Sequence, residues 1–405
     1  MAHQPRREIG GGEGRNELAP AGGGRDSWSS LQCLLRLFRH HLRLGVAPTR
    51  RQRGECCSPS VASRRALLLL LVMLLRASPA NCPRHRVPST ARSCVRACAS
   101  SESPEAHAAS LNATHGLPGS VSFSVGPGGL VKALLTHASG SSAEVHLHGA
   151  TVTSWCLPSG DEVLYLRPDA LFTGAKPIAG GVPLCFPVFG PSPEMQQHGF
   201  ARNLPWEVLR TSGDVNPDYP EPSVTLRLSD SAATRSVWAH AFVALLEVTL
   251  RRDRLKMVLR VRNSNELEPF SFTAAMHSYF EVVDAALPSV KVTGLRGCRY
   301  LDKVPDPKAP TSHVLESESV TFGAALVDRV FQGSPAEVLL EVGTGAAVAV
   351  ENTSGWRDHV VWNPHRTLPD CWNSFVCVES AVTQPVTLPA GYDWEAETNL
   401  SVVDL

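Results

Sequence analysis

The chain has no apolar run long enough to cross a membrane. Its longest run, Ala66–Leu75 (ALLLLLVMLL), would form about 15 Å of helix, which is half of a bilayer core. We therefore expect no stable membrane insertion. The run is similar to the apolar part of a signal peptide, with Arg64 and Arg65 before it, but it lies far from Met1 for a secretory signal.

Lysine is absent from residues 1–100, and no acidic residue occurs between Val61 and Ser101. Residues 1–100 contain 17 Arg and 5 acidic residues, whereas the rest of the chain contains 21 basic and 33 acidic residues. An Arg-rich, Ser-rich segment with few acids is typical of an organelle transit peptide. We expect residues 1–105 to be a basic, low-complexity targeting or disordered extension that directs the protein to the chloroplast. Secretion, a cytoplasmic location and a wrongly assigned start are the alternatives.

The acidic balance of residues 101–405 argues against a nucleic-acid partner, which requires a basic surface to neutralise phosphates. The same part of the chain contains no CxxC pair, so a structural zinc site is not expected. Its five cysteines are scattered singly, several of them in apolar runs, which is typical of free buried thiols. They are Cys156, Cys185, Cys298, Cys371 and Cys377.

Amphipathic stretches long enough for a helix are hard to find. From about Gly119 onward, short runs rich in Val and Leu alternate apolar with polar residues, and turn residues separate them. This pattern predicts an all-β fold, a large antiparallel β-sandwich over residues 119–405. The expected strands include Leu130–Leu135, Glu144–His148, Thr151–Cys156, Glu162–Leu166, Ala241–Leu250, Leu255–Val261, Phe270–Ala275, Glu337–Val342, Ala346–Val350 and Val376–Glu379.

The segment GGVPLCFPVFG, residues 180–190, does not fit a strand. Its prolines cannot donate to a β-ladder, so it predicts a rigid, irregular loop with an apolar lining. Such a loop either borders a sugar site or is a packed crossover, and composition does not choose between these interpretations.

Several histidines are candidates for chemistry. His146 and His148 share one face if they lie on a strand, so they either hold a metal or are two half-exposed surface side chains. His198 lies in a donor-rich cluster with amide and guanidinium groups, which suits sugar hydroxyls and phosphate. His277 and Glu379 each end an apolar run, where burial would raise the pKa of the carboxyl and make it a usable base.

Five segments occur in the order that one enzyme family shows: GGVPLCFPVFG, QQHGFARNLPW, MHSYF, HVVWNP and CVES. From about Gly140 to the C-terminus the chain resembles the glucose-6-phosphate 1-epimerases, which are hexose-6-phosphate mutarotases related to aldose 1-epimerases. The resemblance implies a galactose-mutarotase-like β-sandwich that acts on a small sugar phosphate, with neither metal nor organic cofactor. We expect the protein to be a monomer.

The resemblance also implies roles for individual residues. His277 matches the acid of the H-[ST]-Y-F motif, and Glu379 matches the base of the C-[VI]-E motif. The sequence counterparts of the family's substrate-binding residues are Gln197, His198, Arg202 and Asp302. A base at the C1 hydroxyl and an acid at the ring oxygen together open the ring, so that it can close on the other face.

One position departs from the family pattern. The family usually has Arg immediately before its Gly-Gly-[IV]-Pro motif, where it contacts substrate, but this chain has Ala179. Lys176 is three residues earlier, yet an ammonium does not reproduce the guanidinium fork. An active hexose-6-phosphate epimerase is therefore one hypothesis, and a weakly active or non-catalytic sugar-binding protein is the second. A metal enzyme that uses the two strand histidines is the third.

Overall fold

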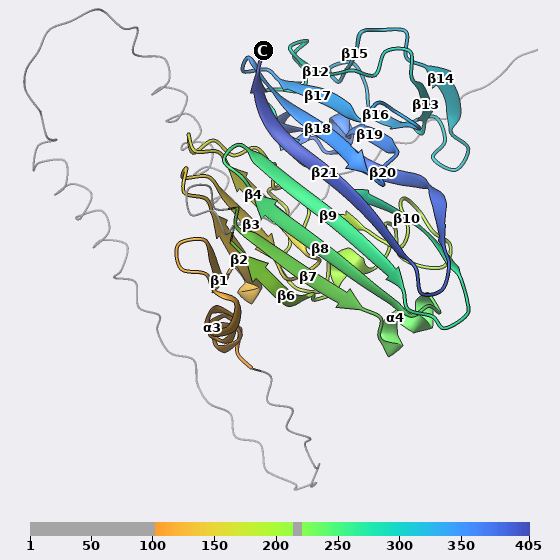
Figure 1. The fold of residues 1–405 in the computed structure, drawn as a ribbon. Helices are drawn as coiled ribbons and strands as arrows, with labels where there is room; N and C mark the ends of the chain where they lie inside the picture. The colour runs from red at the N-terminus through yellow and green to blue at the C-terminus, as the bar shows by residue number, and fades with distance from the viewer. Residues whose placement is uncertain (1–101, 214–220) are drawn as a thin grey trace, which may run out of the picture. The chain divides into compact units, whose positions relative to one another are not determined.

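A computed structural model describes residues 102–213 and 221–405 (Figure 1). The chain divides into two units, Met1–Val95 and Arg96–Leu405, and only the second contains described residues. The apolar run Ala66–Leu75 and almost all of the basic extension, on which the targeting prediction depends, lie outside the described residues. Within the described part of the chain, no helix is long and apolar enough to span a membrane.

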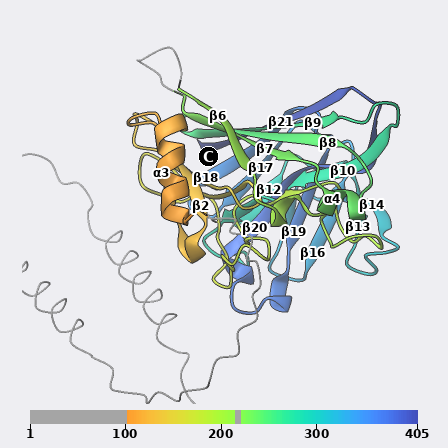
Figure 2. The same ribbon diagram turned by 90° about the horizontal axis from the view of Figure 1, so that it is seen from below.

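Helix α3, Pro104–His115, precedes the sheets and spans the boundary at residue 105 that the sequence suggested. The Ser103 hydroxyl caps it by accepting a hydrogen bond from the Ala106 N–H. The Asn112 amide bonds both the N–H and the C=O of Phe123, which fastens the helix to β1. The helix therefore packs on β1, β2 and β6 (Figure 2), and the sequence analysis did not predict it.

Three sheets make up the rest, and the ladders at their centres are antiparallel. The four-stranded sheet contains β1 (Val121–Val125), β2 (Val131–Thr136), β3 (Ser142–His146) and β4 (Thr151–Cys156), in that order. The nine-stranded sheet has the order β15 (Ser319–Thr321), β12 (Val290–Thr293), β17 (Glu337–Val342), β18 (Ala346–Ser354), β21 (Asp393–Asp404), β9 (Arg254–Asn263), β8 (Phe242–Leu250), β7 (Ser223–Ser229) and β6 (Glu207–Ser212).

The eight-stranded sheet carries the candidate site. Its order is β14 (Thr311–Val314), β13 (Arg299–Asp302), β16 (Val327–Phe331), β19 (Asp358–Asn363), β20 (Phe375–Leu388), β10 (Phe270–Met276) and β5 (Leu184–Cys185). A further short strand, β11 (Tyr279–Glu281), continues beyond β10 and also pairs with β20.

The remaining described helices are short. They are α4 (Ala232–Val237) and the 3₁₀ turns η1 (Pro127–Gly129), η2 (Ala201–Asn203), η3 (His365–Thr367) and η4 (Trp372–Ser374).

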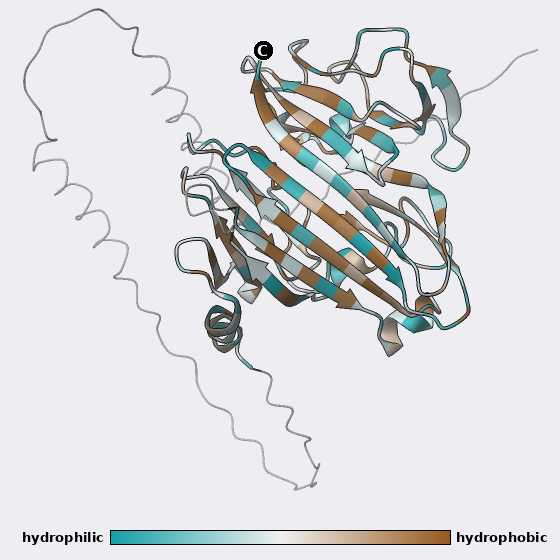
Figure 3. Cartoon of the chain, in the orientation of Figure 1, coloured by the Kyte–Doolittle hydropathy of each residue, from teal (hydrophilic) through white to brown (hydrophobic). Residues whose placement is uncertain are grey.

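One large apolar core draws buried side chains from all three sheets. Hydrophobic and polar residues alternate along the strands, as β7, β8 and β9 show in Figure 3, because successive side chains point to opposite faces of a sheet. The predicted all-β antiparallel sandwich is therefore confirmed. The segment Glu162–Leu166 was expected to be a strand, but it forms only isolated bridges, among them those from Leu164 and Leu166.

Candidate active site

The two candidate catalytic side chains lie opposite each other on neighbouring strands. β10 and β20 pair Met276 with Ser380, and β11 and β20 pair Tyr279 with Cys377. Between these pairs, the same register places His277 across from Glu379, where side chains on one face naturally meet. The Nδ1 atom of His277 lies 3.4 Å from the Oε1 atom of Glu379.

Strand alternation decides which face of the sheet carries this pair. Along β20, Val376, Val378 and Val382 belong to the large core between the sheets. Cys377 and Ala381 belong to two smaller apolar clusters on the opposite face. Glu379 lies between these two in the sequence, so its side chain points away from the main core.

Burial determines the protonation of the pair. The side chain of Glu379 is 2% exposed and that of His277 is 11% exposed. Burial raises the pKa of Glu379 well above its ordinary value, and the nearby Asp328 carboxylate raises it further, while Lys303 and Arg202 partly offset the rise. Burial lowers the pKa of His277 well below its ordinary value. Burial therefore favours the neutral form of each group over its charged form.

Aromatic rings hold His277 in place. Its imidazole stacks on the ring of Tyr279, with centroids 4.8 Å apart and planes 13° apart. The ring of Trp362 meets it edge-on, with centroids 5.8 Å apart. Neither His277 Nδ1 nor Glu379 Oε2 has a hydrogen-bond partner among the described residues, so both are buried polar atoms whose hydrogen bonds the described residues do not supply.

His198 approaches the pair from the loop before η2. Its backbone has a φ of +65°, which is uncommon for a residue other than glycine, and the following Gly199 has a φ of +72°. The Gly190 N–H donates to Nδ1 of His198, so Nε2 carries the proton of the neutral ring. Burial lowers the pKa of His198 to about 3, and its ring centroid lies 5.6 Å from that of His277.

Arg202 and Gln197 flank His198. Arg202 donates from Nη2 to the carbonyl of Gln197, and its charge lowers the pKa of both His198 and His277. The side-chain amide of Gln197 is exposed and lies 3.2 Å from Nε2 of His198. The structure therefore brings four predicted residues to one place: the acid, the base, His198 and Arg202, with Gln197 at the edge.

Asp302 directly precedes Lys303, and its contacts are with residues other than the pair. Its carboxylate lies 3.9 Å from Arg329 and accepts from the Val304 N–H. The two neighbours of Glu379 that the sequence analysis missed are Lys303 and Asp328, whose side chains lie 3.7 Å apart. Strand alternation was the available signal, because Val327 and Phe331 enter the core and therefore turn Asp328 to the other face.

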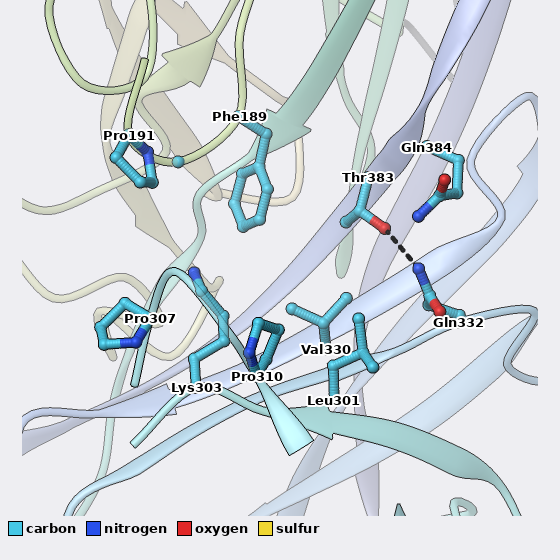
Figure 4. Close-up of a pocket in the computed structure, with 11 residues that line it drawn as sticks. Phe189, Pro191, Leu301, Lys303, Pro307, Pro310, Val330, Gln332, Thr383 and Gln384 are labelled. Carbon is cyan, nitrogen blue, oxygen red and sulfur yellow. Dashed lines mark hydrogen bonds between the residues drawn. The ribbon is translucent and has the colours of Figure 1, made fainter. Parts of the chain in front are cut away.

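A pocket of about 190 Å³ lies beside Lys303 (Figure 4). Its lining includes the Phe189 ring, three prolines and the Gln332 amide, which donates to the Thr383 hydroxyl. Lys303 lies near enough to Glu379 to lower the pKa of that carboxyl. The same side chain therefore lines the pocket and acts electrostatically on the pair.

The proline-rich segment 180–190 supports the pair from one side. Leu184 and Cys185 form the two-residue strand β5 against β10, which the proline content did not predict. The Pro183 carbonyl accepts from the His277 N–H, and the Phe189 N–H donates to the Thr273 hydroxyl. The segment is thus fixed to the strand that ends at the candidate acid.

The two strand histidines are occupied by structural contacts. Nε2 of His148 lies 2.9 Å from the Lys176 carbonyl, and the ring of His146 packs against Phe172, with centroids 5.3 Å apart. In the part of the chain that the structure describes, no three His, Cys, Asp or Glu side chains gather as a metal site requires.

Comparisons with known proteins identify the family of the chain. The family model described as aldose 1-epimerase matches residues 132–401. A protein of Cenchrus ciliaris named "Putative glucose-6-phosphate 1-epimerase" is 34% identical over 292 residues, which cover 68% of this chain and 86% of the relative. A protein of Escherichia coli K12 with the same name is 34% identical over 267 residues, covering 60% of this chain and 82% of the relative.

Solved structures show the same fold. The crystal structure of a putative mutarotase from Salmonella typhimurium superposes with a TM-score of 0.63 at 30% identity, covering 72% of this chain and 96% of that one. The galactose mutarotase-like protein of Clostridium acetobutylicum superposes with a TM-score of 0.56 at 16% identity, covering 70% and 98%.

Proposed function

This chain belongs to the aldose 1-epimerase family, and from this premise we propose that it interconverts the α and β anomers of hexose 6-phosphates. The names of its relatives from Cenchrus ciliaris and Escherichia coli support the phosphorylated substrate. The observation that carries the chemistry is the β-register that sets His277 across from Glu379, 3.4 Å apart.

Ring opening requires an ionised Glu379 and a protonated His277, so the two side chains share one proton. The Glu379 carboxylate takes the proton of the C1 hydroxyl, the bond from C1 to the ring oxygen breaks, and His277 gives its proton to that oxygen. The product is the open-chain aldehyde. After rotation about C1–C2, His277 takes the proton back, the oxygen attacks the other face of the aldehyde, and Glu379 returns its proton to the C1 oxygen.

Burial favours the neutral carboxyl and the neutral imidazole, whereas this sequence starts from a carboxylate and a protonated imidazole. A bound sugar shifts the equilibrium toward the ionised Glu379 and the protonated His277. Its hydroxyls donate hydrogen bonds to Glu379, which stabilises the carboxylate, and the proton crosses the 3.4 Å to His277. Substrate binding thus generates the acid and the base together.

The other groups orient the sugar. His198 presents its Nε2–H beside the pair, and Arg202 adds a cation that holds a hydroxyl or phosphate oxygen. Asp328 and Lys303 border Glu379 from the β13–β16 side. Together these groups offer donors and acceptors around one anomeric centre.

A sugar-binding protein without catalysis is the second candidate function, and Ala179 in place of the family's Arg favours it. Anomer exchange, followed by polarimetry or saturation-transfer NMR, separates the two. We expect wild type to accelerate exchange of glucose 6-phosphate more than that of glucose, and His277→Ala and Glu379→Ala to abolish the acceleration. Binding of glucose 6-phosphate with no acceleration by wild type would favour the second candidate.

For the N-terminal segment we propose chloroplast targeting, because residues 1–100 contain 17 Arg and no Lys. Residues 1–105, fused to a fluorescent protein, should be imported by isolated chloroplasts and shortened by processing. A fusion that stays outside and uncut would contradict the proposal.

A further inference from the structure

The position of Ala179 leaves a gap in the proposed site. The family resemblance implies a substrate-binding guanidinium there, and the methyl group of Ala179 cannot hold an anion. Lys176, the nearest cation before it in the sequence, has an exposed side chain. Any replacement must therefore come from a segment that folds against Ala179.

Arg167 lies directly beside Ala179. Its N–H donates to the Ala179 carbonyl over 3.1 Å, and the preceding Leu166 forms a β-bridge with Gly180. The side chain of Arg167 is only 17% exposed, so it lies along the protein and does not extend into solvent. The side chain that carries this guanidinium thus starts from the segment next to Ala179.

Asp169 orients this guanidinium. Nε of Arg167 donates to Oδ1 of Asp169 over 2.9 Å, and Nη2 donates to Oδ2 over 2.6 Å. Such a two-point contact fixes the plane of the group. Nη1 makes no hydrogen bond within the described residues, so one edge of the fork remains open to a ligand.

The direction of the side chain follows from its neighbours. Leu164 lies in the main core, whereas Tyr165 lies in the apolar cluster on the face that carries the catalytic pair. Tyr165 and Arg167 are two residues apart in an extended segment, so both point to that face. The Tyr165 N–H donates to the carbonyl of Tyr279, whose ring stacks on His277.

The charges of Arg167 and Arg202 both act on Tyr279. Burial raises the pKa of Tyr279, and the charges of both arginines oppose that rise. Both guanidinium groups therefore lie within electrostatic reach of Tyr279, whose ring stacks on the candidate acid. Two arginines around one site suit a dianionic group, because each fork donates two hydrogen bonds to phosphate oxygens.

We propose that Arg167, oriented by Asp169, binds the phosphate of the substrate together with Arg202 and replaces the guanidinium that is missing at Ala179. This assignment rests on the proposed function of the site, and it identifies the residue that makes the enzyme prefer a phosphorylated sugar to a free one.

Lys303 is the rival phosphate ligand, since it borders the pocket of Figure 4. Its ammonium already lies 3.7 Å from Asp328, a carboxylate with a side chain only 22% exposed, and Glu379 is close by. A phosphate at Lys303 would therefore approach buried acidic groups. Asp169, by contrast, is 65% exposed, so water screens its charge from a phosphate at Arg167.

Anomer exchange of glucose 6-phosphate and of glucose, measured on the full chain by NMR, tests the assignment. Arg167→Gln should lower the ratio of the two kcat/KM values roughly 10- to 100-fold, mainly through KM, because charge-assisted hydrogen bonds are lost. Ala179→Arg in the Arg167→Gln background should restore most of the ratio. Arg235→Gln, which removes an exposed arginine paired with Asp230, is the matched control and should leave the ratio unchanged.

Glucitol 6-phosphate, which cannot close a ring, gives a readout that needs no turnover. Its affinity, measured by calorimetry against glucitol, should fall with Arg167→Gln by the same factor as the ratio. An unchanged affinity and ratio, an equal loss for both sugars, or a loss confined to Lys303→Gln would overturn the assignment. If wild type accelerates neither sugar, the proposed function fails, and the glucitol 6-phosphate measurement still decides the role of Arg167.

Discussion

Replacing Glu379 by glutamine should stabilise the folded protein while it removes the proposed catalytic base. Burial raises the pKa of Glu379 above its ordinary value of 4.5. Above that pH the unfolded chain releases this proton and the folded chain retains it, so wild type loses stability as pH rises up to the folded pKa. Glutamine has a similar shape but no proton to release, so the free energy of unfolding of the variant does not fall with pH for this reason.

The size of the effect follows from proton linkage. A difference of one bound proton changes the free energy of unfolding by about 1.4 kcal/mol per pH unit. The difference in unfolding free energy between Glu379→Gln and wild type should therefore rise with that slope above about pH 4.5 and become flat above the folded pKa. Urea unfolding across the range from about pH 5 to pH 8 measures it. The same variant should lose roughly 10²- to 10⁴-fold in kcat.

Glu337→Gln removes an exposed glutamate from β17 and controls for the general loss of a carboxylate. A difference curve for Glu379→Gln without slope would mean that this carboxyl titrates as it does in the unfolded chain. The inference of a desolvated base would then be wrong, even if the variant were inactive.

Three further outcomes are expected. His277→Gln should lower kcat for anomer exchange roughly 10²- to 10⁴-fold, and the double variant with Glu379→Gln should be no slower than the worse single one, because the pair acts as a unit. Asp328→Asn should reduce kcat/KM for glucose 6-phosphate more than Asp302→Asn does, since only Asp328 borders Glu379; equal losses would contradict this placement. Burial lowers the pKa of His359 from 6.5 to about 4. Acidification through this range should therefore cost wild type up to about 3 kcal/mol of unfolding free energy that His359→Gln retains, as parallel unfolding curves in acid would show.

The strands were predictable where alternation alone specifies them. The expected Thr151–Cys156 and Glu337–Val342 coincide with β4 and β17, because each alternates toward the core. Helix α3 was not predictable from its own residues, because its contact with the sheet depends on Asn112 bonding the backbone of Phe123. Tertiary contacts of this kind have no periodic signature in the sequence.

The candidate site was predictable as residue types but not as an arrangement. His277 and Glu379 each follow an apolar run, which marked them as polar groups at a strand end or within a sheet. What joins them is the pairing of β20 with β10 and β11, and register across 102 residues is set by the assembled sheet. Asp302 was predicted from a family motif, whereas Asp328 lies outside every such motif, and only the assembled sheet brings its charge near Glu379.

The structure also bears on the choice between an enzyme and a binding protein. His277 Nδ1 and Glu379 Oε2 are buried without hydrogen-bond partners in the described part of the chain, and burial shifts the pKa of each group against its charged form. An apolar pair at these two positions would make the sheet more stable, and a sugar could still be held by His198 and Arg202. A destabilising imidazole and carboxylate, opposed across one β-ladder, are explained when a proton must move between them and a substrate. A rise in stability with loss of turnover in Glu379→Gln is therefore the combination that an enzyme predicts and a binding protein does not.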